Sequence, residues 1–456
     1  MSLLDTAKKT VDEAVKKGAR QAEVAAFSVR EALTRYTKNV IHQNVVSDDF
    51  GLVLKVVVEG NRIGSVAIDS REKNAVSNGL EMALSMAKVS RPDPDFKTFP
   101  ESKTIAPVGA TYCKETAEFS PEDMALAVKT VIETALDQNK NVKWSAGAYT
   151  TTATKYCIAN SLGVAAENDF TVAYLDTITR AQSTGQEGSG YRIKRSRDVK
   201  EIDPVTIAKD AAKDAVESMN PKQIPLGEYE AIFKPEAVSI FTGFLGRLGF
   251  SSKVYQQGQS FLRGKLGTLM FDEKLTLCDN GRDMNTLTPM ASDGEGVPKR
   301  AVMLINRGVP ENLCYDSYTA LKENRESTGH ALPKVGRGFF SEMPMPMNEV
   351  ISSGDASIDE LIEDTKRGVL ITRLHYVNPT KPDQAIISGM TNDAIWLIEK
   401  GEIKHPTLQM RFTESVIRIL GNIDLLGDKS TLEQTPSCIM PAIKTRFFRF
   451  TGHTEF

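Results

Sequence analysis

The first hundred residues show three successive patterns of apolar and polar positions. Apolar residues between 4 and 15 recur at three- or four-residue spacing, which predicts an amphipathic helix that ends near Gly18. From Ala22 to Asp69 apolar residues alternate with polar ones and β-branched residues are frequent, which predicts antiparallel strands. Helical spacing returns between 76 and 87 and stops before Arg91-Pro92. This order indicates a helix-on-sheet unit.

A second stretch of the chain repeats this layout without repeating the residues. Ser120 precedes a proline and two acidic residues, which is typical of the start of a helix. Residues 144–180 alternate like a strand meander, with a turn at 160–163. Asp203-Pro204 then predicts the start of another helix, and the unit ends at Asn220-Pro221.

After Pro225 the strand patterns dominate, glycine turns are frequent, and helical patterns such as 235–247 are short. We therefore predict an α+β protein with a helix-on-antiparallel-sheet amino-terminal half and a large mixed, mostly β carboxy-terminal domain. The predicted domains cover residues 1–105, 106–222 and 223–456.

The composition of the chain indicates which partners it can bind and in which cellular compartment it is expected. The 456 residues carry a formal net charge of −3, which gives no general attraction for nucleic acid or an anionic membrane. No apolar run approaches the roughly 20 residues of a spanning helix, and the first residues lack the apolar core of a signal peptide. The five cysteines are widely spaced without a CxxC motif. We expect a cytoplasmic protein that binds neither nucleic acid nor membrane.

The usual motifs of catalysis are missing from the sequence. The five histidines are far apart, and neither HExxH, HExxxH nor GxSxG occurs. Asp293 and Glu295 flank a glycine, which we interpret as a turn because two carboxylates are too few ligands for calcium. Lys444, Arg446 and Arg449 alternate with phenylalanines near the end of the chain, which we interpret as a half-buried strand rather than a nucleic-acid strip.

A set of ordered motifs in the second half of the chain resembles the TldD/PmbA family, also called modulators of DNA gyrase, whose members form cytoplasmic peptidase complexes. The motifs are LGEYEAIFKPEAV, QGQSFLRGKLG, SDGEGVPKRAVMLINRGV, YTALKENRESTGHA, RGVLITRL, ISGMTNDAIWLIEKGEI and RFTES. They span more than 200 residues, whereas the amino-terminal half matches mainly in its layout and its IANSLG turn.

The resemblance implies a chain without the family's metal ligands. The catalytic subunits carry HExxxH on the helix after the GEY strand, and those positions fall on Gly243, Phe244 and Leu248 here. None of these can bind zinc. Cys438 lies near the family's cysteine region but has no histidine partners. The chain therefore resembles the PmbA (TldE) branch, with no catalytic residue and no cofactor of its own, and zinc is expected only in a TldD-like partner.

The resemblance also implies a role in handling unfolded peptides, because a sheet-rich domain can take an extended peptide as an added strand. Candidate peptide-binding residues are Ser327, Thr328, Arg367, Gly368, Gly389, Met390 and Thr391. The expected partner is a TldD-like subunit in a heterodimer, or a second copy in a homodimer. Two alternatives stay open: a stand-alone homodimeric peptide-binding or assembly protein, and an autonomous hydrolase whose nucleophile is assembled only by the fold.

Overall fold

Strands from both predicted amino-terminal units form one antiparallel sheet with the order β3-β2-β1-β4-β5-β6. The computed structural model describes residues 2–335, 343–433 and 437–454. β1 pairs with β4 from Glu23–Asn160 to Tyr36–Gly147, which joins residues 1–105 to residues 106–222. The division of this half into two units stays a prediction. The strands are β1 (Gln21–Thr37), β2 (Val40–Val58), β3 (Arg62–Ile68), β4 (Val142–Asn160), β5 (Ala165–Ser183) and β6 (Gln186–Ser196).

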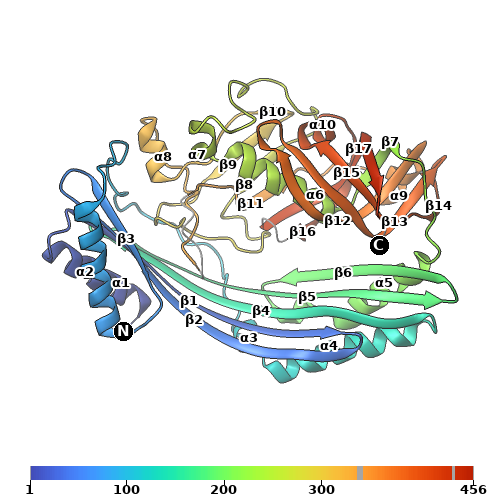
Figure 1. Ribbon diagram of the computed structural model, residues 1–456, viewed down its shortest axis with the longest axis horizontal. Coiled ribbons are helices and arrows are strands. Elements are labelled where there is room, and N and C mark those ends of the chain that lie inside the picture. Colours follow the sequence, from blue (N-terminus) through green and yellow to red (C-terminus); the bar gives the residue numbers. More distant parts are fainter. Residues whose placement is uncertain (1, 336–342, 434–436, 455–456) are drawn as a thin grey trace.

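Two pairs of helices cover opposite ends of one face of this sheet (Figure 1). Val24 and Ala26 of β1 pack against the first pair, and Ala32 and Tyr36 of the same strand pack against the second. These residues are an even number of positions apart, so they point to the same face. The pairs are α1 (Leu3–Lys16) with α2 (Lys73–Val89), and α4 (Pro121–Gln138) with α5 (Pro204–Glu217). Two short helical turns precede the helices of the second pair in the chain: α3 (Lys114–Ala117) before α4, and η1 (Val199–Glu201) before α5.

The helix starts predicted from the sequence are confirmed. The Ser120 hydroxyl accepts a hydrogen bond from the backbone N–H of Asp123, and Pro121 opens α4. Asp203 accepts hydrogen bonds from two backbone N–H groups in the first turn of α5. These side chains satisfy donors that the first turn of a helix cannot pair internally.

The carboxy-terminal half contains the larger, mixed sheet. Its order is β10-β9-β8-β11-β17-β15-β13-β12-β7, and β17 also pairs with β7, which closes a ring of strands. β7 is parallel to β12, and β11 is parallel to β17. The predicted α+β fold is confirmed. The strands are β7 (Gly227–Phe233), β8 (Leu277–Asn280), β9 (Ala301–Asn306), β10 (Val309–Pro310), β11 (Asn348–Ile351), β12 (Arg367–Lys381), β13 (Ile386–Glu399), β14 (Glu402–Pro406), β15 (Met410–Ser415), β16 (Ile423–Glu433) and β17 (Ser437–His453).

The helices of this half are short. The predicted helix over 235–247 is present as α6 (Pro235–Leu245), which continues as a π-helical turn, η2 (Gly246–Phe250). The others are α7 (Ser252–Gln256), α8 (Ser317–Lys322), α9 (Ile358–Glu363), η3 (Pro382–Gln384) and α10 (Val416–Leu420). Within the described ranges no helix is long and apolar enough to cross a membrane.

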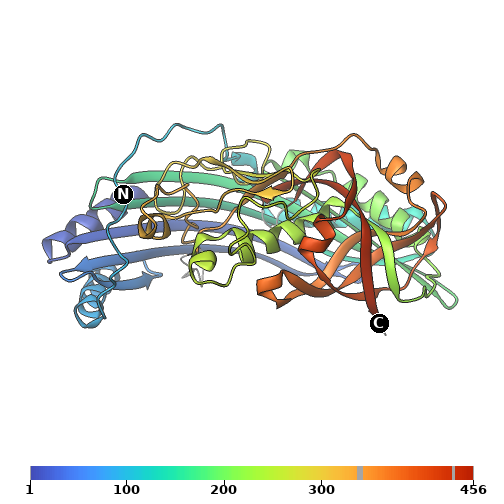
Figure 2. The ribbon, with the colours of Figure 1, turned by 90° about the horizontal axis from the view of Figure 1, so that it is seen from above.

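The carboxy-terminal half packs on the sheet face opposite the helix pairs, as Figures 1 and 2 show from two directions. The Tyr156 hydroxyl of β4 donates to the carbonyl of Gly294 at 2.6 Å. The Arg195 guanidinium of β6 binds Glu433 at 2.5 Å and Glu236 at 3.0 Å. Hydrogen bonds and ion pairs therefore link the two halves of the molecule at both ends of their contact.

Candidate functional site

The helix that follows β7 carries no metal-ligating side chain at the three positions singled out by the sequence. Gly243 has no side chain, Phe244 packs against the main core of the carboxy-terminal half, and Leu248 is buried in that core. A Cβ on Gly246 would lie 2.7 Å from Cγ of Pro346, and one on Gly249 would lie 2.4 Å from the Phe261 ring. Close packing therefore explains Gly246 and Gly249, as well as the apolar side chains of Phe244 and Leu248.

A buried carboxylate faces this helix from β11. Glu349 is 0 % exposed, and neither of its carboxylate oxygens has a hydrogen-bond partner in the described structure. Its Oε1 would lie 3.2 Å from a Cβ on Gly246. Burial raises the pKa of Glu349 to about 8, against a smaller opposing effect of the Thr242 hydroxyl. The side chain is therefore a neutral acid at pH 7.

Cys438 is the neighbour of Glu349 across the parallel β11–β17 pair. The thiol is fully buried, and burial raises its pKa well above the usual range, with a further contribution from Glu349. A buried neutral thiol is neither a good nucleophile nor a good metal ligand. Within the described ranges, no group of three or more His, Cys, Asp or Glu side chains is arranged to hold a metal ion.

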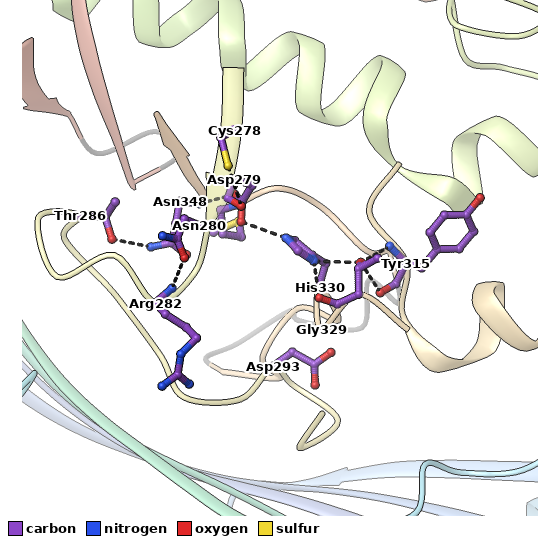
Figure 3. A network of polar contacts seen from close by, with 12 residues as sticks. Cys278, Asp279, Asn280, Arg282, Thr286, Asp293, Tyr315, Gly329, His330 and Asn348 are labelled. Atoms are coloured by element: carbon purple, nitrogen blue, oxygen red, sulfur yellow. Dashed lines mark hydrogen bonds and ion pairs between the residues drawn. The ribbon is translucent and has the colours of Figure 1, made fainter. Parts of the chain in front are cut away.

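A second buried polar network lies at the end of β8 and is drawn in Figure 3, where the His330 ring points at Asp279. Nε2 of His330 lies 2.9 Å from Oδ1 of Asp279, and both side chains are 0 % exposed. The other carboxylate oxygen accepts hydrogen bonds from the backbone N–H groups of Met347 and Asn348, both at 2.6 Å. Burial raises the pKa of Asp279, but the hydrogen bond from His330, the Lys299 cation and the N–H of Asn348 together outweigh it, so the pKa is lowered.

Two of the predicted peptide-binding residues, Ser327 and Thr328, lie in the turn beside this network. The Thr328 hydroxyl is 2.9 Å from Nδ1 of His330, which completes a hydroxyl–imidazole–carboxylate series with Asp279. However, the same hydroxyl accepts from the N–H of Tyr315 and donates to its carbonyl, and Ser327 donates to that carbonyl too. Because the imidazole is buried, this arrangement is suited to fixing the turn rather than to attacking a substrate.

The other predicted peptide-binding residues belong to the β12–β13 pair. Arg367 and Gly368 lie at the start of β12, whereas Met390 and Thr391 pair with His375 and Leu374 near the middle of β12. Gly389 precedes them on β13 and pairs with Phe412 of β15. Seven strand residues, or about 23 Å, separate the two groups. The structure therefore does not bring all these residues into one site, and their role in peptide binding stays a prediction.

Some of these residues lie on strands that are paired with a neighbouring strand on each side, so a peptide cannot pair with the same backbone groups. Gly368 faces Ile398 on β13 and Glu230 on β7. The Arg367 guanidinium lies over the Tyr229 ring at 5.0 Å, and the Thr391 hydroxyl accepts from the N–H of Met410 at 3.0 Å.

The predicted turn at Asp293 and Glu295 is confirmed, with Asp293 fully buried and Glu295 half-buried. Asp293 accepts hydrogen bonds from the N–H groups of Glu295, Val297 and Ala331. Burial raises the pKa of Asp293 to about 6. Burial also raises the pKa of Glu295 well above its usual range, and the neighbouring Asp316 adds to this shift. The two acids therefore stabilise the conformation of their own loop, which contacts β4 through the carbonyl of Gly294.

Comparisons with known proteins agree with this architecture. Residues 226–452 match the PmbA/TldA metallopeptidase C-terminal domain, and residues 114–219 match the PmbA/TldA metallopeptidase central domain. The chain is 21% identical to the metalloprotease PmbA of Escherichia coli O157:H7, over 97% of this chain and 98% of that protein. It is 27% identical to a metalloprotease of Methanothermobacter thermautotrophicus, over 54% of this chain and 52% of that protein.

Among solved structures, the crystal structure of TldE from Thermococcus kodakarensis has the same fold. The two chains superpose with a TM-score of 0.89 over 98% of this chain and 99% of the other, at 23% sequence identity. This likeness covers both halves of the molecule, including the amino-terminal sheet.

Proposed function

We propose a function from one established premise: the chain belongs to the PmbA/TldD metallopeptidase family. Within that family we propose that it is a metal-free subunit of a cytoplasmic peptidase complex that degrades or processes unfolded peptides. It would bind and enclose the peptide, while a TldD-like partner would supply the zinc and the hydrolysis.

This proposal rests on one observation: the side chains of α6 and η2 pack against the core and include no metal ligand at the three positions named above. At the positions where the family's catalytic subunits hold zinc, Phe244 packs against the core and Leu248 is buried in it. Gly246, between them, lies against Pro346, so this part of the helix is built for packing. The structural likeness to TldE supports the same branch of the family.

An open strand edge supports a role in binding an extended chain. β2 pairs with β3 only over Leu52–Val58, so residues 40–51 have no described strand on that side. Val40 and Val45 on this segment are 62% and 45% exposed. An unpaired edge of this length can take a further strand, either from a peptide or from a partner subunit.

Reconstitution with a partner tests the proposal. The purified chain is incubated with a labelled unfolded peptide, alone and with a homologue that carries HExxxH, and bound zinc is measured in each sample. We expect no stoichiometric zinc and no hydrolysis by the chain alone, and faster hydrolysis by the pair than by the homologue alone. A homodimer that binds peptide but never changes the homologue's activity would support the stand-alone alternative. Hydrolysis by the isolated chain in the presence of a chelator would support the autonomous hydrolase.

A further inference from the structure

The centre of the amino-terminal sheet carries a cleft that the proposed function does not use. It has a volume of about 710 Å³, within the range of small-molecule sites, and lies between α1 and strands β1, β2, β4 and β5. The two helix pairs cover the ends of this sheet face, and the middle lies between them (Figure 1). The cleft is on the face opposite the carboxy-terminal half.

The floor of the cleft is a single row of neighbouring residues across four strands. Phe50 on β2 faces Ser28 on β1, Ser28 faces Lys155 on β4, and Lys155 faces Asp169 on β5. Glu167 lines the cleft two residues before Asp169 on the same strand. The row therefore runs from an aromatic side chain through a cation to carboxylates.

A second cation is fixed in place at the aromatic end of the row. The Arg71 guanidinium lies 4.8 Å from the centre of the Phe50 ring and donates a hydrogen bond to the Ser28 hydroxyl at 3.3 Å. Stacking and one hydrogen bond orient the planar group and leave its other N–H donors free to bind a carboxylate in a bidentate manner.

The charged side chains in the cleft form no close ion pairs with one another among the described residues. Six charged side chains line it, three cationic and three anionic, and none of them forms an ion pair within 4.0 Å in the described structure: Lys9, Glu13, Arg71, Lys155, Glu167 and Asp169. The next row of the sheet differs, because Arg30 pairs with Asp48 at 3.0 Å. A ligand with one negative and one positive end would satisfy groups at both ends of the cleft.

We propose that this cleft binds short unblocked peptides, with the terminal carboxylate at Arg71 and the terminal ammonium at Asp169 and Glu167. Three strand spacings, from β2 to β5, amount to about 14 Å. An extended chain of about four residues has the same length. The identification of the ligand as a peptide, rather than another zwitterion, rests on the proposed function, and the site would then retain a short substrate or product beside the peptidase complex.

Calorimetric titration of the full chain with tetra-alanine tests the proposal. Three ligands are compared: the free peptide, the same peptide acetylated at its amino end, and the same peptide amidated at its carboxyl end. We expect the free peptide to bind and each blocked form to bind at least tenfold more weakly. No binding of the free peptide, or equal binding of all three forms, would overturn the proposal.

Two variants assign the two ends of the ligand. Arg71→Gln is expected to abolish the preference for a free carboxyl end and to keep the preference for a free amino end. Asp169→Asn is expected to keep the preference for a free carboxyl end and to weaken the preference for a free amino end. The second preference should be lost at least in part, because Glu167 remains. Lys129→Gln on α4, an exposed residue at the other end of the same sheet face, serves as the control and should bind like the wild type.

These outcomes are separate from those of the reconstitution experiment, because the titration needs no partner and no hydrolysis. If both variants lost affinity equally for all three ligands, the assigned orientation would be wrong.

Discussion

Glu349 makes the stability of this protein depend on pH in a direction opposite to that of an ordinary surface acid. Its carboxyl group is fully buried and has no hydrogen-bond partner among the residues that the structure describes, and burial raises its pKa to about 8. In the unfolded chain the pKa of a glutamate is about 4.3. Between these two values the folded state binds a proton that the unfolded state does not. The free energy of unfolding therefore falls as the pH rises through this window.

The size of the effect follows from the two pKa values. Between pH 5.5 and 8.5 the contribution of Glu349 to the free energy of unfolding decreases by about 3 kcal/mol. Glutamine has a similar shape and does not titrate, so Glu349→Gln should remove this part of the pH dependence. Any cost of burying the amide is the same at every pH and does not affect the comparison.

Urea unfolding of the wild type and of Glu349→Gln at pH 5.5, 7.0 and 8.5 measures this difference. We expect the variant to lose about 3 kcal/mol less than the wild type between the lowest and the highest pH. Glu326→Gln is the control, because Glu326 is exposed and its ion pairs with Arg300 and Lys103 lower its pKa. Parallel curves for the wild type and Glu349→Gln would refute the assignment of a neutral acid at this position.

Substitutions at three further positions test the packing and the buried ion pairs. Gly246→Ala places a methyl group 2.7 Å from Pro346 and should lower the free energy of unfolding by about 1–3 kcal/mol in urea titration; an unchanged value would show that the loop yields. Lys444→Met removes the cation, 1% exposed, that binds three carboxylates, and should cost about 3 kcal/mol, measured as a lower Tm that high salt does not restore. His330→Ala leaves Asp279 without its buried partner and should cost about 3 kcal/mol, whereas His330→Asn, which keeps a donor, should cost less by the same assay.

The sequence predicts the local elements well because each depends on residues near one another in the chain. The N-caps at Ser120 and Asp203 and the turn at 160–163 follow from side chains within four residues. The terminal basic and aromatic stretch forms strand β17 as predicted, although Lys444 lies inside the molecule rather than at its surface.

The sequence does not predict which strands and side chains far apart in the chain become neighbours. The β1–β4 ladder joins residues more than a hundred positions apart, and no local pattern indicates which strands of two similar units become neighbours. Asp279 and His330 are 51 positions apart, and Glu349 lies in a four-residue strand between Asn348 and Val350. The only signal for such residues is a charged side chain within an apolar stretch, and that signal does not name its partner.

The helix that lacks the family's metal ligands keeps a structural role at its other end. Glu236, in the first turn of α6, meets Arg195 of the amino-terminal sheet and Glu433 of β16. Burial, together with the neighbouring Glu236, raises the pKa of Glu433 to about 9, which favours the protonated form of this carboxyl group at pH 7.

The two acids around Arg195 should therefore respond differently to substitution. Arg195→Met leaves Glu236 without its cation and should cost about 3–5 kcal/mol at pH 7. Glu433→Gln replaces a neutral acid by a neutral amide of similar shape and should cost less than about 1 kcal/mol at the same pH, measured by urea unfolding. If Glu433→Gln were as damaging as Arg195→Met, Glu433 would have to be ionised. The contact between the two halves would then depend on a fully charged cluster rather than on one cation, one anion and one neutral acid.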